Sequence, residues 1–354
     1  QEETPDTPEV TVQEETPDTP EVTSLEASSG TFTDSSFSWT LDADGLLTIS
    51  GSGPMPGEKP WGSSAYITKI VLEEGITQLP NDAFNGCATV TEVTLPSTLT
   101  AIGNSAFTNC DALASINLPV GLQTIGDSAF RWCNALREIT LPGTVTNFTN
   151  AFPQSGLERV TIQEGVTAIS SDAFANCGQL EEVKLPSTIT SIGEEAFLKC
   201  SSLTSISLPD TVTSIGAGAF NESGLTSFTI PEGLTSLSNS VLANTKITSI
   251  SIPSHIKTIG DSAFRGCTQM ETLTIAEGVT SIGANAFERC EMITEIVVPD
   301  SVTSLGGYAF KGCENVVTAR LPDHLTVLPE SLFAECYILE DVNMPAALEV
   351  IEAG

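Results

Sequence analysis

The sequence is poor in basic residues, with 13 Lys and Arg against 45 Asp and Glu among 354 residues. The formal net charge of −32 argues against nucleic acid as a partner, because phosphates need a basic surface. The same charge disfavours electrostatic docking on anionic lipid and favours solubility. Because the sequence holds no run of about 18 apolar residues, it predicts no membrane insertion by a helix.

Residues that carry catalysis are also scarce. The two histidines, His255 and His324, stand in separate turn-like segments, whereas nucleophilic catalysis needs a base beside the nucleophile. A phosphate-cradling G-x-x-x-x-G-K-[ST] loop is absent. Paired carboxylates such as Glu181-Glu182 are explained better by a solvated face than by acid/base work. We therefore predict no catalytic residue, no cofactor and no metal ligand, and enzyme activity would need a domain beyond Gly354.

The two ends of the chain differ from its middle. It begins at Gln1 without a methionine or a signal-peptide pattern, which indicates a mature or trimmed form. The segment QEETPDTPEVT occurs twice, at Gln1–Thr11 and Gln13–Thr23, and it offers almost nothing to bury. We predict a disordered, acidic, Pro-rich linker over residues 1–30. The last residues stop midway through a repeat unit, so we expect the natural protein to continue.

Residues 31–66 predict a β-hairpin. Phe37–Leu41 and Leu47–Ser50 alternate apolar and polar residues, and D-A-D-G between them is a tight-turn signal. D-x-D-G also resembles the start of a calcium loop, but the later ligands are missing, which favours a plain turn. An open repeat stack needs a cap at its end. We predict that this hairpin is an N-terminal cap, with Trp39 and Trp61 as cover.

A period of about 23 residues runs through the rest of the chain. It is plain in VTEVTLPSTLTAIGNSAFTNCDA (Val90–Ala112), LEEVKLPSTITSIGEEAFLKCSS (Leu180–Ser202) and ITSISIPSHIKTIGDSAFRGCTQ (Ile247–Gln269). The shared frame is L-x-x-I-x-L-P-x-x-V-T-x-I-G-x-x-A-F-x-x-C-x-x. Residues 67–354 hold twelve full units and a partial thirteenth that begins at Leu339.

Each block of the frame predicts a local structure. L-x-x-I-x-L is a short strand with its apolar residues inward, and Pro or Glu-Gly then turns the chain. V-T-x-I-G is a second extended segment. A-F-x-x-C spaces its apolar groups for one helical or 3-10 turn that places Phe and Cys in the core. The predicted fold is α/β but β-rich, a right-handed solenoid with parallel strands and one such turn per unit.

The combined L-P, V-T-x-I-G and A-F-x-x-C blocks closely resemble the BspA-like, or treponemal-type, leucine-rich repeats of bacterial surface proteins. The resemblance covers the whole array, residues 67–354. The segment WTLDADGLLTISGSGPM (Trp39–Met55) is similar to the cap that precedes such arrays in gut-dwelling Firmicutes. The resemblance implies secretion or display on a bacterial surface, and binding roles such as adhesion to host proteins or other bacteria. It implies no active site.

The cysteines all occupy one position of the unit. Three units carry Ser155, Ser223 or Thr245 there instead, and in those units the next turn is one residue shorter. Metal ligation would need convergent partners that a row of thiols lacks. Disulfides are the rival interpretation, because a secreted protein usually oxidises its cysteines, but side chains held parallel at about 4.8 Å exceed a disulfide's usual Cβ separation. We predict buried, reduced thiols that act as small hydrophobes at Cys87, Cys110, Cys133, Cys177, Cys200, Cys267, Cys290, Cys313 and Cys336.

The outward strand positions, the third and fifth of each unit, are the candidate binding surface. They are mostly small and hydroxylated, which fits either cross-strand Ser/Thr packing or a concave hydrogen-bonding surface for an extended partner. Trp132 stands where other units carry Gly, Asn, Lys or Glu, so it is expected to face outward and join a contact patch or be incidental. The remaining candidate residues are Lys69, Glu92, Asn117, Glu138, Arg159, Lys184 and Arg320.

These features predict a non-enzymatic, secreted or surface-displayed bacterial binding module, monomeric, whose partner is a protein or a glycan. The alternative is a structural or self-associating scaffold of the cell envelope. Three units, at 136–156, 203–224 and 225–246, break the period together with the cysteine row. Any change of curvature is expected there.

Overall fold

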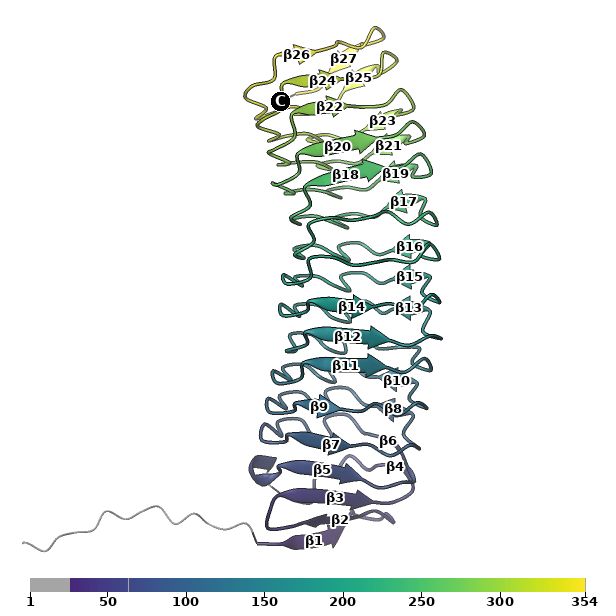
Figure 1. Cartoon of the computed structure of the whole chain (residues 1–354), viewed down its shortest axis with the longest axis vertical. Helices are drawn as coiled ribbons and strands as arrows, with labels where there is room; N and C mark the ends of the chain where they lie inside the picture. Colours follow the sequence, from purple (N-terminus) through teal and green to yellow (C-terminus); the bar gives the residue numbers. More distant parts are fainter. Residues whose placement is uncertain (1–25, 63, 354) are drawn as a thin grey trace, which may run out of the picture.

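The chain winds into a right-handed solenoid whose coils stack along one axis (Figure 1). This computed structural model describes residues 26–62 and 64–353, so most of the linker predicted at 1–30 lies outside the described residues. Each coil contributes up to two short strands, and strands of successive coils pair in parallel. Within the described part of the chain, no helix has the length and apolar character needed to cross a bilayer.

The first described strands form an antiparallel group beneath the coils. β1 (Ser28–Thr31) pairs with β2 (Ser38–Leu41), and β2 pairs with β3 (Leu46–Ser50). The linker boundary expected at residue 30 is therefore wrong, because residues 28–30 belong to β1. Between β2 and β3, Asp42 Oδ1 accepts the N–H groups of Asp44 and Leu46, both at 2.9 Å. The Asp42 carboxylate of the D-A-D-G segment thus closes a turn. A 3-10 helix, η1 (Ser64–Tyr66), precedes the first coil.

The L-x-x-I-x-L blocks form what we call the first strand row, which faces the viewer in Figure 1. Its inward Ile and Val side chains are buried, as the period-two pattern requires. β3 pairs in parallel with the first member of this row and so joins the N-terminal strands to the coils. The row contains β5 (Lys69–Leu72), β7 (Glu92–Thr94), β9 (Ser115–Ile116), β11 (Glu138–Leu141), β12 (Arg159–Ile162), β14 (Glu182–Lys184), β18 (Ser249–Ile252), β20 (Thr272–Ile275), β22 (Glu295–Val297), β24 (Thr318–Arg320) and β26 (Asp341–Val342).

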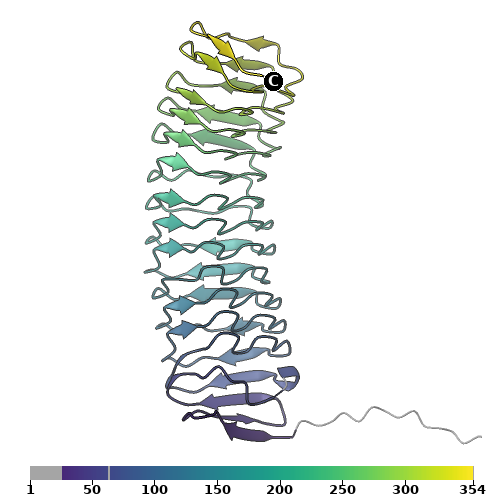
Figure 2. The same ribbon diagram turned by 180° about the vertical axis from the view of Figure 1, so that it is seen from behind.

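The V-T-x-I-G blocks form the second strand row, which Figure 2 shows from behind. Most of its strands are only two residues long, because the glycine that follows starts a turn. The row contains β4 (Gly53–Pro54), β6 (Ile76–Gln78), β8 (Ala101–Ile102), β10 (Thr124–Ile125), β13 (Ala168–Ile169), β15 (Ser191–Ile192), β16 (Ser214–Ile215), β17 (Ser236–Leu237), β19 (Thr258–Ile259), β21 (Ser281–Ile282), β23 (Ser304–Leu305), β25 (Val327–Leu328) and β27 (Val350–Ile351).

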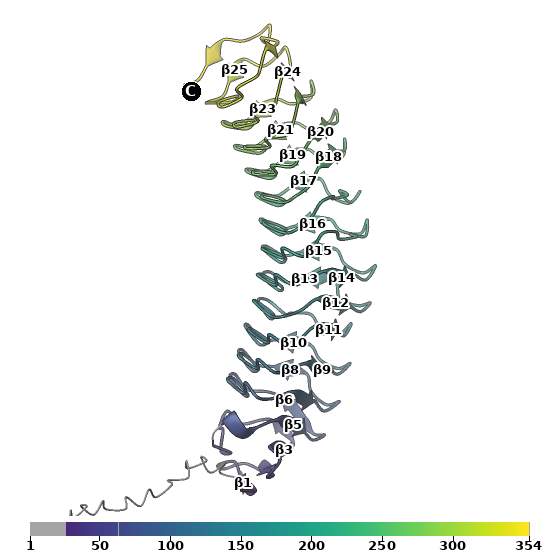
Figure 3. The ribbon, with the colours of Figure 1, turned by 60° about the vertical axis from the view of Figure 1, so that its left-hand side comes forward.

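Both rows are divided into shorter sheets. In the first row β9 does not pair with β11, nor β20 with β22, and the described coils at 203–224 and 225–246 have no strand there. The second row is interrupted at 136–156, between β16 and β17, and between β23 and β25. Each of the three short units therefore interrupts a row. Figure 3 shows the stack bent into one shallow arc with β11, β12 and β14 toward its outer side. The first strand row is therefore not concave, which was one of the two interpretations of its outward positions.

The A-F-x-x-C blocks do not form the helical turn predicted for each unit. They form runs of tight turns in which N–H groups bond alternately within the coil and to the next coil. Cys87 N–H donates to Phe84 C=O at 3.1 Å, a 3-10-type bond, whereas Phe84 N–H donates to Ala106 C=O at 2.7 Å. Asp82 and Gly86 have φ of 57° and 80°. Left-handed residues at such short intervals prevent a right-handed helix from continuing.

The core is a stack of aromatic rings beside a row of thiols. Successive rings lie 5.1–5.9 Å apart, and Leu242 interrupts the stack. All nine cysteines lie among the described residues and are free. Cys133 Sγ donates to Phe107 C=O at 3.2 Å, and burial raises the pKa of the Cys133 thiol to about 12. The thiols thus pack as unreactive small groups. The stacked rings are those of Trp61, Phe84, Phe107, Phe130, Phe152, Phe174, Phe197 and Phe220, and then Phe264, Phe287, Phe310 and Phe333.

The glycine of V-T-x-I-G is required by close approach between coils. A Cβ atom on Gly193 would lie 2.4 Å from the backbone nitrogen of Ser171, and one on Gly216 would lie 2.4 Å from that of Glu194. Neither glycine has a left-handed φ, so the requirement is for space and not for an unusual dihedral angle. The coils can therefore stack at hydrogen-bonding distance on this side.

Candidate ligand-binding surface

The charged candidates on the first strand row are bonded to one another. The register of the parallel strands places Lys69 beside Glu92 and Glu138 beside Arg159 on adjacent strands. Lys69 Nζ lies 3.1 Å from Glu92 Oε2, and Arg159 makes a short, two-nitrogen contact with Glu138. The Glu138 carboxylate raises the pKa of Arg159. Exposed pairs of this kind are screened by solvent, so they do little for stability.

Lys184 and Arg320 follow the same pattern farther along the row. Lys184 Nζ lies 3.3 Å from Glu182 Oε1, two residues away on β14. Arg320 donates to Asp341 Oδ2 at 2.5 Å, and that carboxylate raises the pKa of Arg320. Because the charges neutralise one another in pairs, the row offers a ligand few free charges.

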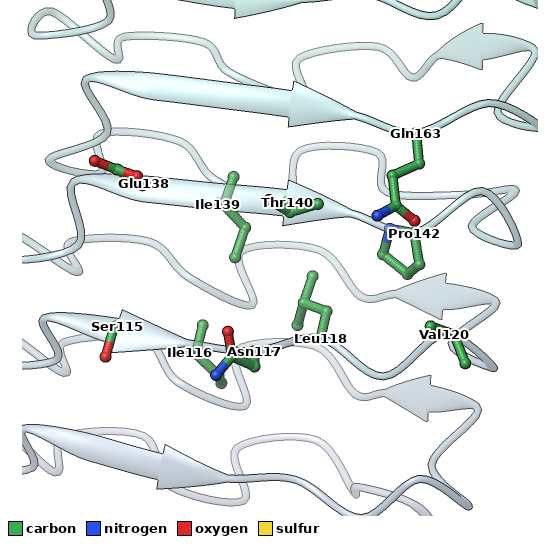
Figure 4. A pocket seen from close by; sticks show the side chains of 10 residues that line it. All are labelled: Ser115, Ile116, Asn117, Leu118, Val120, Glu138, Ile139, Thr140, Pro142 and Gln163. Carbon is green, nitrogen blue, oxygen red and sulfur yellow. The ribbon is translucent and has the colours of Figure 1, made fainter.

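A groove crosses the first strand row where β9 and β11 fail to pair. Its volume is about 350 Å³. Figure 4 shows these two strands farther apart than β11 and the strand above it, with side chains from both bordering the gap. The buried Ile116 and Ile139 form its floor. The other residues that line it are Ser115, Asn117, Leu118, Val120, Glu138, Thr140, Pro142 and Gln163.

The coil at 136–156, which contributes β11, differs from its neighbours in two ways. Phe148 takes the position that Ile occupies in the frame, is fully buried, and lies 6.1 Å from the ring of Phe174. Its second-row strand is reduced to a single bridge between Asn147 and Thr124. A ring larger than Ile does not fit a close-packed core unless the backbone moves. We attribute the groove to this displaced coil.

The groove combines free polar groups with an apolar wall. Within the described residues, the side-chain amides of Asn117 and Gln163 have no hydrogen-bond partner, and neither does the hydroxyl of Thr140. An amide both donates and accepts hydrogen bonds. Val120 is 77% exposed and lies, like Pro142 on the next coil, toward one end of the groove (Figure 4). The one carboxylate, that of Glu138, is already paired with Arg159 on the next coil.

Similar hollows occur at other interruptions of the strand rows. One lies between β20 and β22, where Thr272, Thr274 and Val297 line it. Another lies between β23 and β25 of the second row and includes His324. Missing strand pairs thus account for these three hollows, whereas a smaller one lies between the paired strands β7 and β9.

Two of the predicted candidates, Asn117 and Glu138, line the groove at β9 and β11, and the structure brings them together. Gln163 and Val120 were not predicted, because they follow the strands in positions that the repeat frame leaves open. The signal that could have located the groove was Phe148 in an Ile position of a short unit.

Trp132 belongs to a run of turns and not to either strand row. Its side chain is 38% exposed, and the Arg131 guanidinium lies 3.9 Å from the centre of its ring. Arg131 Nε–H also donates to Gln154 Oε1 at 3.0 Å on the next coil. The indole is therefore held on the surface by a cation–π contact, apart from the other candidates.

The two histidines are separate and engaged in other contacts. His255 Nδ1 lies 3.4 Å from Glu232 Oε2, and His324 Nε2 lies 3.0 Å from the Val302 carbonyl oxygen. In residues 26–62 and 64–353, neither ring bonds a hydroxyl or thiol that could act as a nucleophile. No cluster of three or more metal-ligating side chains occurs in the same residues.

Known proteins resemble this chain over most of its length. The family described as "BspA type Leucine rich repeat region (6 copies)" matches residues 61–177, 148–247 and 235–354. A leucine-rich repeat protein of known structure from Bacteroides ovatus is 25% identical with a TM-score of 0.77, over 92% of this chain and 89% of that chain. One from Eubacterium ventriosum is 24% identical with a TM-score of 0.61, over 92% and 93% of the two chains. No curated protein matches at a significant level.

Proposed function

Because the chain belongs to the BspA-type leucine-rich repeat family, we propose that it is a non-enzymatic binding module that acts outside a bacterial cell. The family match confirms the resemblance predicted from the sequence, and the similarity to the B. ovatus protein confirms the parallel-stranded solenoid. The family's association with bacterial surface proteins supports secretion or surface display. The partner we propose is a host protein or glycan, or a molecule on another bacterium.

The groove between β9 and β11 is the observation that carries this proposal. It is a hollow on the first strand row, and it offers unpaired amides beside an apolar wall. Convergent polar groups in an apolar concavity are the usual features of a binding site. Since Glu138 is neutralised by Arg159, the groove suits an uncharged segment of a ligand.

Binding to immobilised extracellular matrix and to purified mucin, measured by biolayer interferometry, tests the proposal. We expect the wild-type chain to bind one of them and the double variant Asn117→Ala, Gln163→Ala to bind at least about tenfold more weakly, as for loss of a binding hot spot. Ser207 and Thr229 are exposed positions of the same row in coils away from the groove. The control double variant Ser207→Ala, Thr229→Ala should bind like wild type.

Two results contradict the proposal. One is absence of binding to matrix, mucin and whole cells of neighbouring bacteria. The other is equal binding by the groove variant and the control variant, which would remove the groove from the contact.

A self-associating envelope scaffold is the second candidate function. It would use exposed apolar side chains in the last coils, on which either a further coil or a second copy of the chain would stack. The net charge of −32 opposes it, since copies repel one another, and our leading proposal keeps the protein monomeric. Sedimentation velocity over a range of concentrations separates the two. The exposed residues are Tyr337, Ile338, Met344, Val350 and Ile351.

A further inference from the structure

Trp132 occupies a backbone position that disfavours it. Its φ is 57°, in the left-handed region, and the equivalent residues of neighbouring coils are Asn109, Gln154 and Asn176, with φ of 59°, 57° and 62°. Glycine and asparagine adopt this conformation readily, whereas a bulky aromatic residue is strained in it. Local folding therefore does not explain a tryptophan at this position.

Core packing does not explain Trp132 either. The other two tryptophans, Trp39 and Trp61, are 8% and 6% exposed and cover the start of the stack, whereas Trp132 is 38% exposed. Among the described residues, the group stacked on its ring is the guanidinium of Arg131, which Gln154 fixes in place. A ligand can contact the part of the indole that stays exposed.

Unpaired polar groups flank the indole along the same row. In the described part of the chain, the side-chain amides of Asn109 and Asn176 have no hydrogen-bond partner, nor does the Trp132 indole N–H. Coil-to-coil bonds keep these positions aligned: Asn109 N–H donates to Arg131 C=O at 2.9 Å, and Gln154 N–H donates to Ala175 C=O at 3.1 Å. Successive coils thus present an aligned row of donors and acceptors about 4.8 Å apart.

This stretch is chemically distinct from the rest of the row. Its four positions are uncharged in a protein of net charge −32. Farther along, the same left-handed position is occupied by charged residues in several coils. These are Lys199, Glu222, Arg289 and Glu335. An amide row with an indole within it is therefore confined to the coils from Asn109 to Asn176.

We propose that this amide–indole row binds a neutral oligosaccharide. The apolar C–H face of a sugar ring packs on an aromatic ring, and sugar hydroxyls donate and accept hydrogen bonds as amides do. A protein partner would need about 800 Å² per side with an apolar centre, and here the indole is the one large exposed apolar group among the described A-F-x-x-C turns between residues 103 and 179. The proposal rests on the binding role proposed above but not on the groove.

Calorimetric titration of the full chain with maltohexaose, cellohexaose and chitohexaose tests the proposal. We expect saturable binding of at least one, together with a shift in tryptophan emission, because Trp132 is the exposed member of the three tryptophans. Trp132→Asn introduces the residue that neighbouring coils carry, so its fold and thermal midpoint should stay close to wild type. Its affinity for the oligosaccharide should fall by about tenfold or more.

Two controls separate this site from the groove. Glu222→Asn also introduces an asparagine, at an equivalent left-handed position outside the amide stretch. This variant should leave oligosaccharide binding intact. The groove variant Asn117→Ala, Gln163→Ala should also bind the oligosaccharide like wild type. The proposal is overturned if none of the three sugars binds, or if Trp132→Asn binds as well as wild type. It is equally overturned if Trp132→Asn unfolds, which would make the tryptophan structural, or if a matrix protein and no sugar depends on Trp132.

Discussion

At the scale of single residues, carboxylates of Glu-Gly turns join one coil to the next. Glu164 Oε1 accepts the backbone N–H of Ser187 at 2.9 Å, and Glu164 Oε2 accepts the Ser187 hydroxyl at 3.1 Å. Glu74 makes the same pair of bonds with Ser97, both at 2.9 Å. These hydrogen bonds lower the pKa of both carboxyl groups below the ordinary value of 4.5.

The lowered pKa of Glu164 makes stability depend on pH in one direction. Because the folded-state pKa lies below the unfolded value, the contribution is complete above pH 4.5 and is lost as pH falls through the folded pKa. We predict that Glu164→Gln lowers the thermal midpoint at pH 7 and reduces the loss of stability on acidification. Thermal unfolding followed by circular dichroism between pH 7 and pH 3 measures both effects.

A matched substitution separates the effect of losing the hydrogen bonds from the effect of losing one negative charge. Glu271 is exposed and its carboxylate makes no hydrogen bond among the described residues, so Glu271→Gln should leave the shape of the pH profile unchanged. Identical pH profiles for the two variants would show that the bonds to Ser187 contribute nothing beyond general electrostatics.

The sequence correctly predicted which side chains face inward, because burial alone decides that. The cysteine row is buried apart from the partly exposed Cys336, because the repeat frame itself places it inward. The charged candidates could be placed on the outer face of the strands, but their pairing could not be predicted. Whether Arg159 meets Glu138 or Glu182 depends on side-chain directions across three strands, which periodicity does not specify.

At the scale of elements, the strand segments could be predicted and the turn runs could not. A-F-x-x-C has the spacing of a helical turn, yet Ser105 and Asn109 have φ of 53° and 59° and stop any helix. The alternative is stabilised by N–H groups that bond the next coil, as Phe107 N–H does to Ala129 C=O at 2.8 Å. Such bonds exist only in the stack, so single-unit propensity could not predict them.

In one coil of the aromatic stack, a large and a smaller side chain occupy each other's usual positions. Leu242 stands where the other coils place Phe, and Phe228 stands at an Ile position of the same coil. The Phe228 ring lies 5.5 Å from that of Phe220 on the preceding coil, and so occupies part of the space beside the stack. The volume lost at one position is thus regained at the other.

This exchange predicts strong coupling between the two positions. Leu242→Phe alone overfills the coil and should destabilise the protein by about 1–3 kcal/mol. Leu242→Phe combined with Phe228→Ile restores the pattern of the other coils and should recover most of that loss. Urea unfolding of both single variants and the double variant gives the coupling energy. Additive effects would mean that the two rings do not share space.

At the scale of the whole molecule, departures from the repeat shape part of the surface. The groove and the hollow between β20 and β22 lie where strand pairing is lost. The sequence located the short units but not the groove, because separation of β9 from β11 results from how neighbouring coils pack together. The stack also has unequal ends, since antiparallel strands cover the first coil.

The N-terminal strands contact the coils through the pairing of β3 with β5 and also through the ring of Trp61, and the second contact yields a prediction for the whole stack. The Trp61 ring lies 6.0 Å from Phe32 of the N-terminal group and 5.9 Å from Phe84 of the next coil. Trp61→Ala should destabilise the N-terminal end by about 3–5 kcal/mol. In a stack whose units contact only their neighbours, hydrogen exchange should then quicken in β5 and β7 and stay unchanged from β18 onward.

The control variant Phe264→Ala, in the interior of the stack, should instead quicken hydrogen exchange in the coils on both sides of it. If Trp61→Ala raised exchange uniformly along the stack, the molecule would unfold as one cooperative unit, and the N-terminal strands would stabilise every coil equally.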